Sequence, residues 1–117
     1  MSVRVRNLTR HTILAEAAAV ADTSAKRRTG LLKHARLAPG EGLWIVPCES
    51  VHSFFMKFAI DLVYLDRKHT VRKVRRAMRP WRISVCPSAY SILELPVGTI
   101  QSSRTEAGDQ LLIEDVP

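Results

Sequence analysis

The stretch Ile60-Asp61-Leu62-Val63-Tyr64-Leu65 decides the fold of this chain. If the stretch is extended, both of its faces carry apolar side chains, with Asp61 as the exception. A strand with one face in water alternates apolar and polar residues, whereas a strand covered on both faces does not. The stretch therefore predicts a central strand of a β-sheet.

Other short strand-like runs lie on both sides of this central strand. In Val3-Arg4-Val5-Arg6, apolar and basic residues alternate with the period of a strand that has one buried face. Prolines and glycines separate further runs, at residues 43–46, 53–58, 71–74, 83–86, 89–95 and 110–114. Because strands do not alternate with helices, we expect a mainly β, single-domain antiparallel sandwich or barrel-like fold.

One short helix is predicted near residues 23–33. Thr23 is a good helix N-cap, so the helix should begin there and run through Leu31 and Leu32. The alanine-rich residues 12–21 also favour helix by propensity, but that run is short and leads directly into the cap. We therefore place the helix after this run.

The aromatic stretch at residues 53–58 is predicted to be another strand. If it is extended, Phe54, Met56 and Phe58 share one face, and Lys57 lies on the other. We therefore expect Met56 in the core.

Length and composition fit one globular domain, residues 1–117. The chain has 117 residues, of which 46% are hydrophobic and 25% charged, and about two thirds of the unfolded surface can be buried at this size. Eighteen Lys and Arg against 11 Asp and Glu give a net charge of +7, which attracts polyanions. No uncharged apolar run approaches the roughly 18 residues of a membrane-spanning helix. We also expect a monomer or a weak dimer.

The cysteines and the N-terminus favour a cytoplasmic protein. Only Cys48 and Cys86 occur, too few for a disulfide scaffold and compatible with a reducing compartment. Residues 1–21 imitate a secretory signal, because arginines precede an apolar stretch that ends in small residues. Glu16 interrupts that stretch, so we disfavour secretion.

Cys48-x-x-x-His52 together with Cys86 raises the question of a zinc site, or of a thiol nucleophile with His52 as its base. A structural zinc site needs a fourth ligand, and none stands at a diagnostic spacing. Nothing in the sequence distinguishes a reactive thiol from a buried one. We predict no metal and no cofactor.

Asp61 is the charged residue of the central stretch and shares a face with apolar neighbours. A buried carboxylate must be paired or must accept several N–H bonds, because isolated burial costs several kcal/mol. We predict a structural ion pair of Asp61 with Arg79, Arg82 or Arg27. A ligand-facing or acid–base role for Asp61 is the alternative.

Basic residues are concentrated in residues 67–82, a segment that contains no acid. With Trp81 beside Arg82, the segment could follow a phosphate backbone and stack a base. Alternatively, it is a solvated hairpin whose arginines shield a sheet edge from aggregation. We predict weak, salt-sensitive binding of heparin and nonspecific DNA, through an anion-binding surface of Arg67, Lys68, Arg72, Lys73, Arg75, Arg76 and Arg82.

Three ordered groups of motifs carry a resemblance to a known family. The first is Arg27-x-x-Gly30-Leu31-Leu32 with Pro39-Gly40-Glu41-Gly42-Leu43. The second is His52-Ser53-Phe54-Phe55-Met56-Lys57-Phe58-Ala59, continuing through the central stretch to Asp66. The third is Arg79-Pro80-Trp81-Arg82, Leu93-Glu94-Leu95-Pro96-Val97-Gly98 and Gly108-Asp109-Gln110-Leu111.

Over about residues 15–112 the chain resembles domain of unknown function family 192, also called uncharacterised protein family 0127. The resemblance implies a mostly antiparallel β domain of sandwich type, with a short helix near the Arg-x-x-Gly-Leu motif and a strand at residues 12–21. It brings no known reaction, cofactor or ligand. Lys68-His69 replaces an Asp-Gly-like hairpin tip, which leaves the tightness of that turn open.

Two classes of function follow from these observations. The first is a binding or accessory module for an anionic ligand or a protein partner. The second is an enzyme that uses Asp61 with His52 or Lys57, and weak nucleic-acid binding through residues 67–82 is a further alternative. The candidate pocket or anchor residues are Arg27, His52, Met56, Lys57, Asp61, Arg79 and Trp81.

Overall fold

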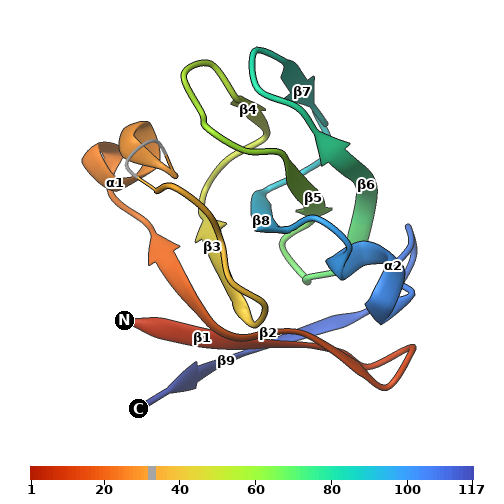
Figure 1. The fold of residues 1–117 in the computed structure, drawn as a ribbon. Coiled ribbons are helices and arrows are strands. Elements are labelled where there is room, and N and C mark those ends of the chain that lie inside the picture. Colours follow the sequence, from red (N-terminus) through yellow and green to blue (C-terminus); the bar gives the residue numbers. More distant parts are fainter. Residues whose placement is uncertain (32–33) are drawn as a thin grey trace.

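The structure is a computed structural model that describes residues 1–31 and 34–117. It confirms a mainly β fold, in which the described residues form nine strands and two short helices (Figure 1). In chain order these are β1 Ser2–Asn7, β2 Thr12–Ala21, α1 Ser24–Thr29, β3 Glu41–Ile45, β4 Ser50–His52, β5 Ile60–Leu65, β6 Val71–Met78, β7 Ile83–Val85, β8 Ser91–Pro96, α2 Thr99–Ser103 and β9 Leu111–Val116.

Seven of the strands form one curled sheet in the order β6-β5-β8-β3-β2-β1-β9. A bridge between Thr70 and Gln110 joins the outer strands at one end, where the Leu111 N–H also donates to the His69 carbonyl at 3.0 Å. The sheet is therefore barrel-like. One pair departs from the antiparallel prediction, because α1 carries the chain back so that β3 runs parallel to β2.

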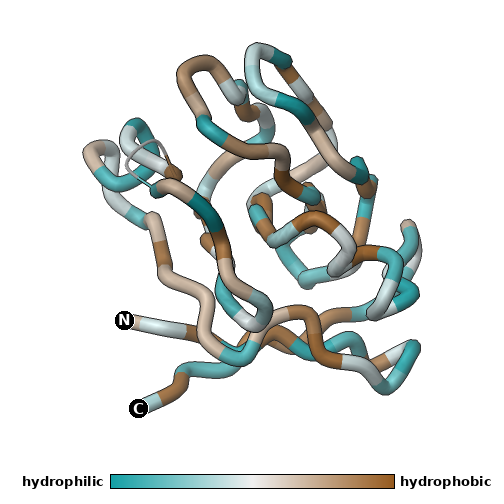
Figure 2. The backbone as a smooth tube through the Cα atoms, viewed as in Figure 1, coloured by the Kyte–Doolittle hydropathy of each residue, from teal (hydrophilic) through white to brown (hydrophobic). Residues whose placement is uncertain are grey.

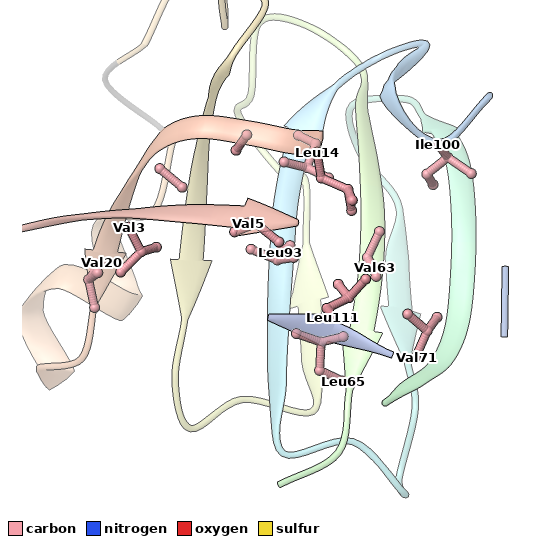
Figure 3. Packing of buried hydrophobic residues seen from close by; sticks show 13 residues of the cluster. Val3, Val5, Leu14, Val20, Val63, Leu65, Val71, Leu93, Ile100 and Leu111 are labelled. Atoms are coloured by element: carbon pink, nitrogen blue, oxygen red, sulfur yellow. The ribbon is translucent and has the colours of Figure 1, made fainter. Parts of the chain in front are cut away.

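The interior of the curled sheet holds one hydrophobic cluster. Figure 3 shows side chains from β1, β2, β5, β8 and β9 packed together although these strands are distant in sequence. The larger members include Val3, Val5, Leu14, Val63, Leu65, Leu93, Leu95, Ile100 and Leu111, all 3% exposed or less.

A second cluster lies on the opposite face of β5 and β8. It joins Leu62 and Tyr64 of β5 to Ile92 of β8 and to Leu31 after α1. The small β4–β7 sheet also belongs to this layer, because the Tyr64 hydroxyl bonds the Ser84 hydroxyl of β7 at 2.7 Å. All six residues of β5 are buried, which confirms the central strand.

The first helix begins where its cap predicts. The Thr23 side chain accepts the Lys26 N–H, and the helix ends at Thr29 before Gly30, whose φ of 48° is left-handed. The predicted continuation through Leu31 is wrong, because Gly30 and Leu31 lie in a turn, and its last residue, Leu32, falls outside the described residues. The strand at 12–21 is confirmed as β2, whereas α2 has no counterpart in the sequence prediction. No helix among the described residues has the length and apolar character needed to cross a membrane.

Residues 53–58 do not form the predicted strand. The strand β4 ends at His52, and the chain then turns, with Phe55 in the left-handed region at φ 67°. Buried Ser53 fixes this turn, because its hydroxyl donates to the Arg79 carbonyl at 2.6 Å and its carbonyl accepts the Trp81 N–H at 3.0 Å. Met56 is nevertheless in the core, at 7% exposure.

The hairpin after β5 turns tightly despite its unusual tip. The Asp66 carboxylate accepts the N–H groups of Lys68 and Thr70, both at 2.9 Å. His69 occupies the left-handed position with φ 65°. An Asx-type turn therefore replaces the Asp-Gly tip.

Candidate functional site

Asp61, at 1% exposure, is held by backbone groups and not by an arginine. One carboxylate oxygen accepts the Ala77 N–H at 2.8 Å, and the other accepts the N–H groups of Gly98 at 3.2 Å and Ile100 at 3.0 Å. The predicted ion pair with Arg79, Arg82 or Arg27 is therefore wrong for the part of the chain that the structure describes.

The three donors to Asp61 exist because the surrounding backbone is irregular. The β5–β6 register shifts beside Asp61, and Ala77 has a left-handed φ of 50°, so its N–H leaves the ladder. Gly98 and Ile100 lie at the start of α2, where backbone N–H groups have no partner within the helix. Asp61 thus anchors β5 to β6 and to α2.

Glu94 is the second buried carboxylate of this sheet, on the neighbouring strand β8. Asp61 pairs with Leu95 and Leu62 with Glu94, so the two carboxyl groups lie on opposite faces of the sheet. Glu94 is 4% exposed, and its Oε1 has no hydrogen-bond partner among the described residues. Burial raises the pKa of Glu94 from 4.5 to about 7.

Glu94 lines a cavity of about 420 Å³ on the outer face of the sheet. The cavity lies between the end of α1, strands β3 and β4, and the turn after β4. Its apolar wall includes Leu31, Ile45, Val51 and Met56, and its basic members are Arg27, Arg28 and His52. A mostly apolar cavity with a few polar groups is typical of small-molecule sites.

Gly30 keeps the space beside Glu94 open. It ends α1 with a left-handed backbone, which an L side chain adopts with strain. A Cβ at this position would lie 4.0 Å from Oε1 of Glu94. The motif Arg27-x-x-Gly30 therefore places at the cavity both a cation and a backbone segment that has no side chain.

The basic side chains of the cavity differ in how firmly they are held. The Arg27 guanidinium donates to the carbonyls of Asp22 at 3.1 Å and Val46 at 3.4 Å, which ties α1 to the end of β3. Arg28 and His52 are exposed. The cavity therefore joins positive charge to a buried carboxyl group.

Cys48 also lines the cavity, but its surroundings disfavour the thiolate. The thiol donates to the Ser50 carbonyl at 3.0 Å. Burial raises the pKa of Cys48, and the charge of Glu94 adds to this effect. Cys48 and Cys86 are both free, and no three His, Cys, Asp or Glu side chains among the described residues are placed to hold a metal ion.

The structure brings only part of the predicted set together. Three of the seven candidate residues line the cavity, namely Arg27, His52 and Met56. The other four do not, namely Lys57, Asp61, Arg79 and Trp81. Lys57, Arg79 and Trp81 are exposed, and Asp61 lies on the other face of the sheet.

Sequence reasoning missed Glu94, although a signal for it existed. It is the acid in the otherwise uncharged strand Ser91–Pro96, the same pattern that drew attention to Asp61. Gly30 and Glu94 both belong to the family motifs, but sequence alone does not show that the end of α1 and strand β8 lie side by side.

The basic segment lies along β6 and the turns beside it. Lys73 donates to the Val85 carbonyl at 2.8 Å and Arg75 to the Ile83 carbonyl at 3.0 Å. Arg67 stacks over the ring of Tyr90, 4.1 Å from its centroid. In the described chain, no cation of residues 67–82 lies within ion-pair distance of a carboxylate.

Comparison with known proteins agrees with this architecture. The family model DUF192, described as "Uncharacterized ACR, COG1430", matches residues 5–113. The chain belongs to the DUF192 family. Among curated DUF192-type relatives, the UPF0127 protein of Thermococcus sibiricus is 39% identical over 79% of this chain and 62% of its own length. The UPF0127 protein of Pyrococcus abyssi is 36% identical over 79% of this chain and 81% of its own length.

Solved structures share the fold of this DUF192 chain. A Sinorhizobium meliloti protein, described as a candidate transcription regulator, matches with a TM-score of 0.83 at 19% identity, over 96% of this chain and 92% of that one. A protein of unknown function from Novosphingobium aromaticivorans matches with a TM-score of 0.81 at 17% identity, over 96% and 84%. At these identities the likeness concerns the fold alone.

Proposed function

We propose that this DUF192 chain is a binding module that takes a small anionic ligand in the Glu94 cavity. One observation carries the proposal: a buried carboxyl oxygen without a partner among the described residues lines a cavity of about 420 Å³. An unsatisfied buried carboxyl group destabilises a fold, and such groups are concentrated at functional sites. A ligand supplies the partner that the fold leaves out.

Charge favours an anion as that ligand. Arg27, Arg28 and His52 line the same cavity. Because burial holds the pKa of Glu94 at about 7, the neutral acid is well populated and can donate its O–H to a ligand oxygen. A bound anion raises the pKa of Glu94 further, so anion and proton should bind together.

The alternative, an enzyme that uses Asp61 with His52 or Lys57, finds no support in this geometry. Both oxygens of Asp61 already accept backbone N–H groups, and the Asp61 side chain lies on the opposite face of the sheet from the cavity. A general base must come within hydrogen-bond reach of its proton. Asp61 and His52 therefore have separate roles.

Binding of a panel of small oxyanions tests the proposal. Inorganic phosphate, succinate and glucuronate are titrated into the chain by calorimetry at pH 6 and pH 8. We expect at least one to bind, with an affinity that falls by up to about tenfold per pH unit above 7, because binding takes up a proton. Affinity that rises with pH, or no binding by any of the three, contradicts the proposal.

A matched pair of variants assigns binding to this cavity. Arg28 and Lys26 are both exposed on α1, but only Arg28 lines the Glu94 cavity. We expect Arg28→Gln to weaken oxyanion binding by roughly threefold to tenfold, and Lys26→Gln to change it by less than about twofold. Equal effects of the two variants would indicate nonspecific attraction to the basic chain.

A further inference from the structure

A row of apolar side chains is exposed along the turns beside β4 and along β7. Four of the eight large hydrophobic side chains that are exposed among the described residues lie there: Phe55 at 70%, Trp81 at 56%, Ile83 at 61% and Val85 at 50%. The rings of Phe55 and Trp81 are 4.7 Å apart, and Ile83 pairs with His52 across the small sheet. We call these four residues the apolar row.

The apolar row lies at one end of the molecule. Figure 1 shows the turn after β4 beside the turn between β6 and β7, and Figure 2 shows hydrophobic residues along much of the turn after β4. An exposed row of this kind on a folded domain marks an interaction surface.

The two aromatic members of the row are held in strained positions. Phe55 and Trp81 have left-handed backbones, with φ of 67° and 66°, which bulky residues adopt rarely. Ser53 fixes both turns, since its hydroxyl accepts the Arg82 N–H at 2.9 Å and its N–H donates to the Arg82 carbonyl at 2.9 Å. The strain persists because these bonds over-determine the two turns, which is common at binding surfaces.

Cations border the apolar row directly. Lys73 and Arg75 donate to the carbonyls of Val85 and Ile83, so their charges lie beside the two aliphatic members. Arg82 follows Trp81 in the chain, and Arg76 and Arg79 are exposed nearby on β6 and after it. The surface therefore combines apolar side chains with positive charge that has no carboxylate within ion-pair distance in the described residues.

We infer that the apolar row binds the surface of an anionic lipid bilayer. Trp81, Phe55 and the aliphatic pair enter the interface, while the bordering cations contact the headgroups. A second copy of the chain fits poorly, because pairing through this face would bring the basic residues of the two copies together. Single-stranded nucleic acid fits less well too, because Ile83 and Val85 offer no ring on which a base stacks.

Vesicle binding tests this inference with substitutions at Trp81 and Ile83, which do not line the Glu94 cavity, whereas Phe55 of the row does. Trp81→Asn with Ile83→Thr removes two row members, and Asn tolerates the left-handed backbone at residue 81. The control combines Leu8→Asn with Val97→Thr, since Leu8 and Val97 are exposed at 45% and 53% in other turns. Each protein is sedimented with vesicles of phosphatidylcholine alone or mixed with phosphatidylglycerol.

We expect binding to the mixed vesicles only, with a loss of roughly tenfold in the row variant and none in the control. The unsubstituted chain should also show a blue shift of tryptophan emission on these vesicles, which does not depend on how any variant folds. Equal vesicle binding by the row variant, or no blue shift, overturns the inference. The inference is also overturned if binding of a single-stranded DNA oligonucleotide depends on Trp81 and vesicle binding does not.

Discussion

Asp61 and Glu94 lie on neighbouring strands of one sheet and are both almost fully buried, at 1% and 4% exposure. Asp61 accepts three backbone N–H groups, whereas Oε1 of Glu94 has no partner among the described residues. Two similar patterns, one acid in a short strand that is otherwise free of charge, thus lead to different hydrogen bonding. Burial alone does not tell an anchor from the binding group that we propose for Glu94.

The surroundings of each face explain the difference. The Asp61 face meets a β-bulge in β6 and the first turn of α2, both of which leave N–H groups without backbone partners. The Glu94 face meets the end of α1, where Gly30 leaves open space. Asp61 is satisfied because irregular backbone beside it offers free N–H groups. Glu94 stays unsatisfied because the space beside it at Gly30 is open.

Removal of the Asp61 carboxylate should have the largest effect. Asp61→Ala leaves the N–H groups of Ala77, Gly98 and Ile100 without their acceptor, so we expect a loss of roughly 3 to 5 kcal/mol in the free energy of unfolding. Urea denaturation measures it, with exposed Asp22→Ala as a control that should change stability by less than about 0.5 kcal/mol. A loss no larger than that of the control contradicts the anchor role.

Glu94→Gln should have the opposite sign. The folded pKa of about 7 lies above the ordinary value of 4.5, so the folded chain holds a proton that the unfolded chain releases between these values. The Glu94 contribution to stability is therefore present below pH 4.5 and is lost as pH rises to 7, by roughly 3 kcal/mol in total.

We expect thermal and urea unfolding at pH 8 to show Glu94→Gln as the more stable protein, because the amide carries no charge to bury. Between pH 5 and pH 8 the difference between the two proteins should grow. A variant that is less stable than the parent at pH 8 would show that the carboxylate has a partner.

Two glycines sharpen the comparison at a smaller scale. Gly98 and Gly30 both have left-handed backbones, with φ of 98° and 48°, so substitution of either by Ala should cost about 1 kcal/mol. A Cβ at Gly98 meets nothing within 4 Å, whereas one at Gly30 lies 4.0 Å from Oε1 of Glu94. Only Gly30→Ala should therefore weaken oxyanion binding, and calorimetry on the two variants should separate them.

The sequence predicted features that depend on local pattern. The central strand at Ile60–Leu65 and the start of α1 at Thr23 follow from burial on both faces and from side-chain capping. The strand that the pattern predicts at 53–58 does not form, because the bonds of Ser53 to residues 79–82 override the local preference.

The candidate site could not be predicted in the same way. The chemistry of Arg27, His52 and Met56 marks them as candidates, and they do line the cavity. Glu94 joins them there only through the pairing of β8 with β3 and β5. The sequence shows an acid in each strand without showing which face meets free N–H groups. That choice is made by tertiary structure.

Titration of the Glu94 carboxyl group tests the central claim most directly. The ¹³C resonance of this carboxyl is followed from pH 3 to pH 9 by nuclear magnetic resonance and is assigned by its absence in Glu94→Gln. We predict a midpoint at about pH 7, which moves upward in the presence of the oxyanion of the panel that binds. A midpoint near the ordinary value of 4.5, unmoved by any oxyanion of the panel, would contradict the account.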